Sequence, residues 1–296
     1  LAAVPPNKRA KVDRELLTDV KKGEDASRRI GELDLIGRSG PDGTAVQLER
    51  LISDWNLAMR KDQLRLPKLM SDVRKMEKRL QEEAEALQGR TSKANQAQYE
   101  QVKAEAAELR RGIWQQGRLV DAAVAAGARA LAREEGSQLD KSVATILRGV
   151  RKARERERLD VLAILARADH PGVRERLRAE LAAEREPLFR AELIESLSVQ
   201  GDAEIVPTLL GTPLTDGNWL VRSRAAAALA RLRVKDAIPA LIDRLETEQE
   251  GRVRTDFGRA LASLTGQDVR GNITLWRRWW EDNRAGFEFP AAAPPA

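Results

Sequence analysis

The sequence predicts an all-α protein: an α-solenoid, a right-handed superhelix of stacked helix pairs, from which an antiparallel coiled-coil hairpin protrudes. Two patterns favour this fold, a repeat of 32 residues in the C-terminal half and two long apolar series at coiled-coil spacing in the N-terminal half. Composition agrees, since charged residues make up 33% of the 296 residues and aromatic residues only 4%. A chain rich in Ala, Leu, Arg and Glu is typical of long helices.

The first helix pair is expected over residues 24–60, after an N-terminal segment over 1–23. In "ASRRIGELDLIGRSGPDGTAVQLERLI", Arg29 precedes Ile36 by seven residues, the spacing that separates arginine and leucine in the later repeats. "GRSGPDG" supplies the turn residues, so a second helix should begin near Thr44. One repeat-like pair therefore precedes the middle of the chain.

A coiled-coil hairpin is predicted as an insertion over residues 61–117. Apolar residues recur in steps of three and four along two series, 48–87 and 99–131, apart from short gaps. The polar stretch between the series places the tip at about 88–96, and two such limbs joined by a short loop indicate antiparallel helices. Pro67 should kink or interrupt the first limb, because its ring clashes with the carbonyl four residues earlier.

The C-terminal half repeats with a fixed period. Residues that recur every 32 positions are Arg158, Arg190, Arg222 and Arg254, and Leu165, Leu197, Leu229 and Leu261. Each unit has the apolar spacing of two helices, and the second opens with a proline, which a first helical turn tolerates. We expect the periodic arginines to bond to the turn of the neighbouring helix pair.

This pattern resembles the HEAT repeat family, in particular the bacterial HEAT-like repeats of the phycobilisome-lyase type. The resemblance is strongest over 156–286 and weaker over 10–60, and "RSRAAAALARLRVKDAIPALIDRL" carries it best. It implies HEAT-like repeats over 118–286 that serve as a binding scaffold. Lyase activity does not follow from the resemblance, because no residue set for handling a chromophore is matched.

Three tryptophans close the array. The last unit of a repeat protein has no neighbour to cover its apolar face. Trp276 and Trp280 are four residues apart and share a helix face, so we predict that they form a structural cap. Trp279 points off that face, and base stacking or ligand binding is the alternative role. Residues 287–296 are expected to be a flexible Pro/Ala tail.

Candidate partner-binding residues lie in a basic segment and at the hairpin tip. "RGVRKARERER", read as one central basic helix over 148–158, could bind phosphates or an acidic partner. The alternative is a solvated face with Arg–Glu pairs, each worth a few tenths of a kcal/mol. The candidates are Arg148, Arg151, Lys152, Arg154 and Arg158, with Arg90 and Lys93 at the tip.

No catalytic, cofactor-binding or metal-binding residue is predicted, and the protein is not expected to be an enzyme. The chain has no cysteine and one histidine, His170, which precedes a proline and should lie in an interhelical turn. No local carboxylate motif, GxSxG setting or glycine-rich phosphate loop appears.

The sequence therefore predicts a non-enzymatic protein-binding scaffold or complex subunit. Its solenoid surface and coiled-coil arm would engage protein partners, or the arm would join copies into a homo-oligomer. The alternatives are nucleic-acid binding by the basic helix, disfavoured because acidic residues are interspersed, and an accessory subunit of an enzyme complex. No apolar run approaches the ~20 residues that cross a bilayer. "LAAVPP" would suit a mature end after signal-peptide cleavage, and an artificial truncation would explain it equally well; the first interpretation favours a bacterial periplasm or envelope over the cytoplasm.

Overall fold

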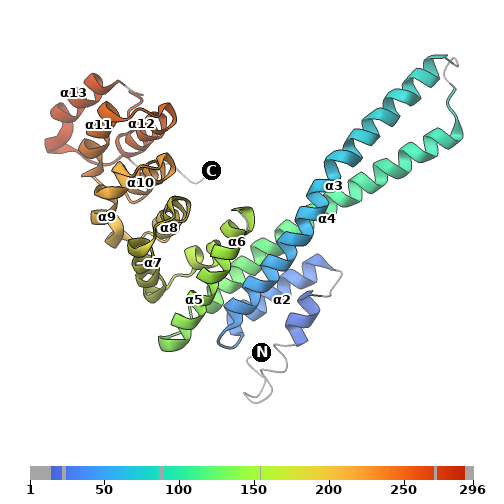
Figure 1. Cartoon of the computed structure of the whole chain (residues 1–296), viewed down its shortest axis with the longest axis horizontal. Coiled ribbons are helices and arrows are strands. Elements are labelled where there is room, and N and C mark those ends of the chain that lie inside the picture. The colour runs from blue at the N-terminus through green and yellow to red at the C-terminus, as the bar shows by residue number, and fades with distance from the viewer. Residues whose placement is uncertain (1–14, 22–24, 87–89, 154, 270–271, 291–296) are drawn as a thin grey trace. The chain divides into compact units, whose positions relative to one another are not determined.

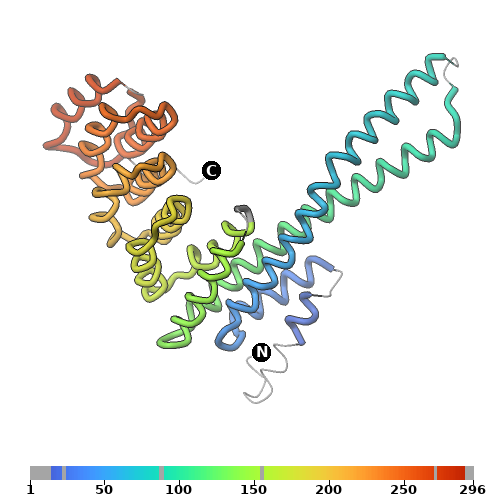
Figure 2. The backbone as a smooth tube through the Cα atoms, viewed as in Figure 1, coloured from blue at the N-terminus to red at the C-terminus, as the bar shows by residue number. Residues whose placement is uncertain are grey.

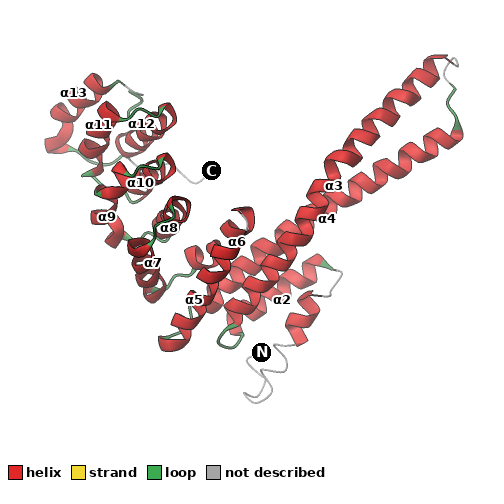
Figure 3. Cartoon of the chain, in the orientation of Figure 1, coloured by secondary structure: helices red, strands yellow, loops and turns green. Residues whose placement is uncertain are grey.

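The protein is all-α, as predicted. The computed structural model describes residues 15–21, 25–86, 90–153, 155–269 and 272–290, and the regular structure in these ranges is entirely helical (Figure 3). The chain divides into two compact units, Leu1–Ile164 and Leu165–Ala296. This division falls inside the segment 118–286 that was expected to be one run of repeats.

The first unit is built around a long helical hairpin. Its helices are α2 (Ala26–Ser39), α3 (Thr44–Ala86), α4 (Lys93–Leu131), α5 (Gly136–Lys152) and α6 (Glu155–Arg167), the last of which crosses into the second unit. α3 and α4 run antiparallel and pack against each other, which Figure 2 shows as two tubes joined at one end. The hairpin is therefore present, and its description as a coiled coil stays a prediction.

The expected interruption at Pro67 is wrong, because α3 continues through this residue as one helix. Pro67 is exposed, so its ring lies on the outer side of the hairpin. Gln63, whose carbonyl loses its helical partner, is a residue that water partly reaches. The cost of the missing hydrogen bond is therefore reduced, and packing against α4 supports the continuous helix.

The base of the hairpin is covered by α2. α2 continues through Gly37 to Ser39, into the segment that was expected to be turn, and α3 begins at Thr44 as predicted. The main neighbour of α2 is nevertheless α4, not the helix that follows it in the chain. Gly37 permits this close crossing, because a Cβ there would lie 2.6 Å from the Cα of Ala126. The N-terminal pair therefore departs from an ordinary two-helix repeat.

The second unit is a stack of short helices. In chain order these are α7 (Pro171–Ala183), α8 (Pro187–Val199), η1 (Ala203–Ile205), α9 (Val206–Leu210), η2 (Thr212–Thr215), α10 (Trp219–Arg231), α11 (Ala237–Thr247), α12 (Gly251–Thr265), α13 (Ile273–Asn283) and η3 (Arg284–Gly286). α8, α10 and α12 pack one on the next, and they begin at residues 187, 219 and 251. α7, α9, α11 and α13 lie on the other side of this row (Figure 1). The unit is the α-solenoid that the 32-residue period predicts.

Three of the four periodic arginines, Arg190, Arg222 and Arg254, form hydrogen bonds with the turns between helix pairs, as expected. Arg190 donates to the carboxylate of Asp216 over 2.7 Å, and Arg222 donates to the carbonyl of the same residue over 2.7 Å. Arg222 also donates to both carboxylate oxygens of Glu248, at 2.7 and 2.8 Å. Arg254 donates to the carbonyl of Glu248 over 3.1 Å. Each acidic turn residue is thus held by two successive arginines.

An aromatic cluster lies on α13, the last α-helix that the structure describes. Trp276 is completely buried, while Trp279 and Trp280 are half-buried and stack with ring centroids 6.3 Å apart. Phe287 lies edge-on to both stacked rings, at 6.1 and 5.6 Å. A completely buried indole on the last long helix is the placement that a cap requires. The rings of Trp280 and Phe287 lie against Trp279, so less of its indole surface is accessible to a ligand than in a fully exposed tryptophan.

The predicted flexible tail begins later than residue 287. Phe289 packs on Phe287 with centroids 5.1 Å apart, and the guanidinium of Arg233 lies 4.8 Å from the ring of Phe289. Arg233 also donates to the carbonyl of Pro290 over 2.8 Å. The ring contacts of the two half-buried phenylalanines and the hydrogen bond to Pro290 hold residues 287–290 against the solenoid. The remaining tail, 291–296, lies outside the described residues.

Candidate functional site

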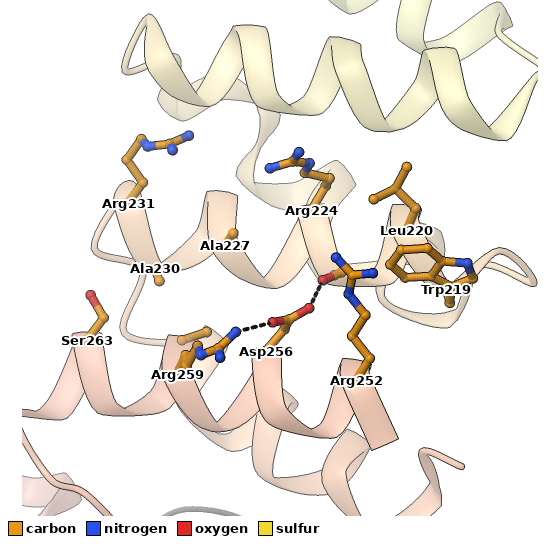
Figure 4. A pocket seen from close by; sticks show the side chains of 12 residues that line it. Trp219, Leu220, Arg224, Ala227, Ala230, Arg231, Arg252, Asp256, Arg259 and Ser263 are labelled. Atoms are coloured by element: carbon orange, nitrogen blue, oxygen red, sulfur yellow. Dashed lines mark hydrogen bonds and ion pairs between the residues drawn. The ribbon is translucent and has the colours of Figure 1, made fainter. Parts of the chain in front are cut away.

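A groove of about 570 Å³ opens on the row of α10 and α12 (Figure 4). Its polar and aromatic lining is contributed by Trp219, Arg224, Arg231, Arg252, Asp256 and Arg259, and we call it the arginine groove. Arg224, Arg231, Arg252 and Arg259 are all exposed. The groove is a strongly charged hollow within the described helices of the second unit.

Helical spacing places the four arginines. Arg224 and Arg231 are seven residues apart on α10, and Arg252 and Arg259 are seven apart on α12. Seven residues are nearly two turns, so each pair shares a face and is separated by about 10 Å along its helix. Because α10 and α12 pack side by side, the two pairs border one hollow.

Two carboxylates neutralise part of this charge. Glu195 of α8 accepts a hydrogen bond from Arg231 over 2.9 Å and lies 3.6 Å from Arg224. Asp256 accepts a hydrogen bond from Arg259 over 2.9 Å and another from the hydroxyl of Ser223. The groove and its immediate partners therefore carry more guanidinium groups than carboxylates.

Arg252 differs from the other three arginines. Its guanidinium lies 4.6 Å from the ring centroid of Trp219, which starts α10 and is 36% exposed. A cation over an indole face is attracted by the ring quadrupole, which holds the side chain in place without neutralising it. Among the residues that the structure describes, no carboxylate forms an ion pair with Arg252.

Small residues form the floor of the groove. Ala227 and Ala230 on α10 and Ala260 on α12 line it between the arginines. Their short side chains leave the space that larger residues would fill. The groove therefore combines an apolar floor with a positive rim, which suits the binding of an anionic group attached to an apolar one.

The groove offers binding rather than acid–base chemistry. The Ser223–Asp256 hydrogen bond lacks an imidazole that would take the serine proton. His170 lies elsewhere, in the turn between α6 and α7 as predicted, where it is the N-cap of α7 and its Nδ1 accepts from the backbone N–H of Gly172 over 3.1 Å. Within the described ranges, no three or more His, Asp or Glu side chains lie together so that they could hold a metal ion.

The basic segment 148–158 is not one helix, and that expectation is wrong. α5 ends at Lys152, Ala153 is extended with φ −70° and ψ 153°, and α6 begins at Glu155. Cationic side chains favour the C-terminal end of a helix and acidic residues favour the N-terminal end. Arg151 and Lys152 before Ala153 and Glu155 and Glu157 after it agree with this preference, whereas Arg154, Arg156 and Arg158, which also follow Ala153, do not, so charge order alone does not explain the break.

The predicted partner-binding residues of this segment are separated by the break. Arg148, Arg151 and Lys152 are exposed on the last turns of α5, and Arg158 is half-buried in the first turns of α6. Arg154 lies outside the described residues. α5 packs on α3, where burial raises the pKa of Glu49 and the nearby Glu157 raises it further, against an opposing effect of Arg50.

The two tip residues are also exposed. Arg90 and Lys93 lie at the end of the hairpin, next to a turn that Glu83 closes. The Glu83 carboxylate accepts from the backbone N–H of Ser92 over 3.1 Å and from the amide of Asn95 over 3.0 Å. The structure therefore separates the tip residues from the basic segment by the length of the hairpin and does not bring the two sets together (Figure 1).

Sequence reasoning missed the arginine groove, although one signal was present. Trp219 stands at the position that Pro187 and Gly251 occupy in the equivalent helices of the 32-residue frame. A bulky aromatic residue at the start of a helix, where neighbouring repeats have small or helix-starting residues, indicates a role other than core packing. The arginines gave no such signal because exposed arginines are common throughout this chain.

One family model matches the chain, and it covers the groove. Residues 174–262 match the model described as HEAT repeats, a range that includes all of α8 to α11 and most of α7 and α12. No curated protein and no solved structure matches the chain significantly. In the described part of the chain, no helix is both long and apolar enough to pass through a membrane. The helix pairs that carry the arginine groove are therefore similar to HEAT repeats over the matched range.

Proposed function

We propose that the protein is a non-enzymatic protein-binding scaffold or complex subunit. HEAT repeats commonly mediate contacts between proteins, and proteins built from them are generally scaffolds rather than enzymes. The observation that carries the proposal is the arginine groove, an open hollow with exposed charges and an exposed indole on the surface of the HEAT segment. Exposed Trp and Arg side chains are the types that contribute most energy to protein interfaces.

The arm, residues 61–117 of α3 and α4, is proposed as a second binding surface. Leu64 on α3 is 71% exposed and Trp114 on α4 is 62% exposed. Arg118 lies 5.0 Å from the ring centroid of Trp114, so the indole has a polar neighbour but no apolar cover. Large exposed apolar side chains on an extended hairpin support engagement of a protein partner or of a second copy of the chain.

Capture from the native source tests the scaffold proposal. The tagged full chain should retain a protein in a constant molar ratio after nuclease treatment and washing. The double variant Leu64→Gln and Trp114→Gln should lose an arm-bound partner or shift the oligomeric state measured by light scattering. Leu275→Gln is the matched control, because Leu275 is 51% exposed on α13, outside the arm.

The proposal fails if the chain returns alone and monomeric, or if it retains only nuclease-sensitive nucleic acid. The nucleic-acid alternative has less support, because the basic segment is broken at Ala153 rather than presented as one helix. An accessory role in an enzyme complex is a special case of the scaffold, and the identity of the retained protein would distinguish it.

A further inference from the structure

We propose that the arginine groove binds a short acidic segment of a protein partner, with two carboxylates about three or four residues apart and an apolar side chain between them. The inference rests on the proposed scaffold function and names the chemistry of one partner. It depends on four properties of the groove: unbalanced charge, a preoriented guanidinium, the spacing of the arginine pairs and an apolar floor.

The charge imbalance equals two guanidinium groups. Four arginines line the groove, whereas Glu195 and Asp256 are the two carboxylates that pair with them. Glu195 is shared, since it is hydrogen bonded to Arg231 and lies 3.6 Å from Arg224, beyond hydrogen-bond distance. Arg224 therefore keeps N–H donors available for a ligand. Two acidic side chains from a partner would balance the groove.

Arg252 is the best-placed anchor for one of them. Figure 4 shows this side chain reaching from α12 toward α10, beside Trp219. The indole restricts the guanidinium to a narrow range of positions, so less side-chain entropy is lost when a ligand binds. A planar guanidinium can hold a carboxylate through two parallel N–H···O bonds. The same geometry makes Lys a poor replacement at this position.

The spacing of the arginines fits an extended peptide. Within each pair, seven residues of helix separate the side chains by about 10 Å. An extended chain advances about 3.3 Å per residue, so carboxylates three or four residues apart are separated by about 10 to 13 Å, close to the spacing within a pair. The floor formed by Ala227 and Ala260 lies between the charged positions and leaves room for one apolar side chain.

A protein segment fits the groove better than nucleic acid does. Nucleic acid requires a continuous basic track along a repeating phosphate backbone. Residues 165–296 contain 19 basic and 20 acidic residues, so the second unit has no such excess of positive charge. Asp256 and Glu195 within the groove would also repel successive phosphates. A short peptide needs only the local excess of two charges.

Peptide selection on the full chain tests the inference. A library of random phage-displayed 12-residue peptides is panned against the purified protein, and enriched peptides are synthesised with a fluorescent label for polarisation titrations. We expect enriched sequences to carry acidic pairs three or four residues apart around an apolar residue. Their affinity should fall as salt is raised from 50 to 300 mM, because the contacts are ionic.

The variant Arg224→Ser with Arg252→Ser should weaken these peptides roughly 10- to 100-fold, since each lost charge-assisted contact corresponds to up to about a tenfold change. The control variant Arg278→Ser with Arg284→Ser removes two exposed arginines outside both the groove and the arm and should bind as wild type. Far-UV circular dichroism checks folding. Ala227→Gln fills the exposed floor without changing charge, and it should weaken binding independently.

Three outcomes overturn the inference. Enriched peptides without acidic residues reject the ligand chemistry, and acidic peptides that bind the groove variants as tightly as wild type reject the site. In both cases the protein still binds peptides, so the proposed scaffold function stands, while the assignment of an acidic segment to the groove fails. Recovery of no peptide, together with groove-dependent binding of a 20-nucleotide single-stranded DNA, rejects the acidic segment and the scaffold function together.

Discussion

Arg222 shows how one side chain joins two helix pairs of the solenoid. It donates to the carbonyl of Asp216 in one turn and to both carboxylate oxygens of Glu248 in the next. Burial by itself raises the pKa of Glu248. The hydrogen bonds from Arg222 and from the backbone N–H of Glu250 outweigh this effect, so the pKa of Glu248 lies below its ordinary value. The hydrogen bond with Glu248 likewise raises the pKa of Arg222. The pair is therefore stabilised in its ionised form.

Glu248→Gln should lower the free energy of unfolding at pH 7 by about 2–3 kcal/mol, because it leaves a nearly buried guanidinium without its carboxylate. The folded pKa is depressed, so the ionic contribution is present above the unfolded value, near 4.5, and is lost as pH falls through the folded value. Urea unfolding of wild type and variant at pH 7 and at pH 3 measures the difference, which should shrink at pH 3.

Glu246→Gln is the matched control, since its pair with Arg277 is about half exposed on both sides. Exposed pairs contribute little, so its effect should stay within about 0.5 kcal/mol. If Glu248→Gln and Glu246→Gln lowered the free energy of unfolding equally, burial would not make the Arg222–Glu248 pair stronger than the Arg277–Glu246 pair.

At the residue scale, the sequence predicted the structural arginines but not the groove. Arg190, Arg222 and Arg254 recur every 32 residues, and a bond needed in each repeat must recur with the repeat. Arg224 and Arg252 occupy different positions of the frame, so no periodicity marks them. The two arginines border one groove only because α10 and α12 pack side by side. The order of residues along the chain does not show this arrangement.

Helix packing at the base of the hairpin depends on one glycine. α2 crosses α4 where Gly37 meets Ala126, and a Cβ on Gly37 would lie 2.6 Å from the Cα and 2.9 Å from the carbonyl oxygen of Ala126. These are backbone atoms, so no rotation of a side chain can relieve the contact. The crossing therefore requires glycine at this position, although glycine is a poor helix former.

Gly37→Ala should destabilise the first unit by about 1–3 kcal/mol, the usual cost of overpacking, despite the better helix propensity of alanine. Gly31→Ala on the same helix is the matched control, because nothing lies within 4 Å of its added Cβ. It should stabilise by about 0.5–1 kcal/mol. Thermal unfolding followed by circular dichroism separates the two variants, and a stabilised Gly37→Ala protein would contradict the close crossing.

At the element scale, local signals predicted helices well and their partners poorly. The start of α3 at Thr44 follows from turn residues next to it in the chain. The break at Ala153 carries no glycine or proline, so the usual local signals for a helix end do not mark it. The pairing of α2 with α4 depends on Gly37 and Ala126, which are far apart in the sequence. Local pattern alone cannot reveal such a contact.

The second unit is a nearly one-dimensional array in which helix pairs contact chiefly their neighbours. In such an array, stability is approximately the sum of the repeats and the interfaces between them. A destabilising substitution at one end of the array is therefore expected to lower the stability of the nearest repeats most. The buried ring of Trp276, which lies on the terminal helix α13, provides the means to test this property.

Trp276→Ala should cost about 3–5 kcal/mol at the C-terminal end of the array, because it removes a completely buried indole. Hydrogen–deuterium exchange read by mass spectrometry should show the largest gain in exchange in α11, α12 and α13, a smaller gain in α10, and little change in α7. Leu275→Ala is the control, since that side chain is 51% exposed on the same helix. Uniform gain of exchange across α7 to α13 would mean that the unit unfolds as one cooperative block, and local loss at α13 alone would mean that Trp276 supports only its own helix.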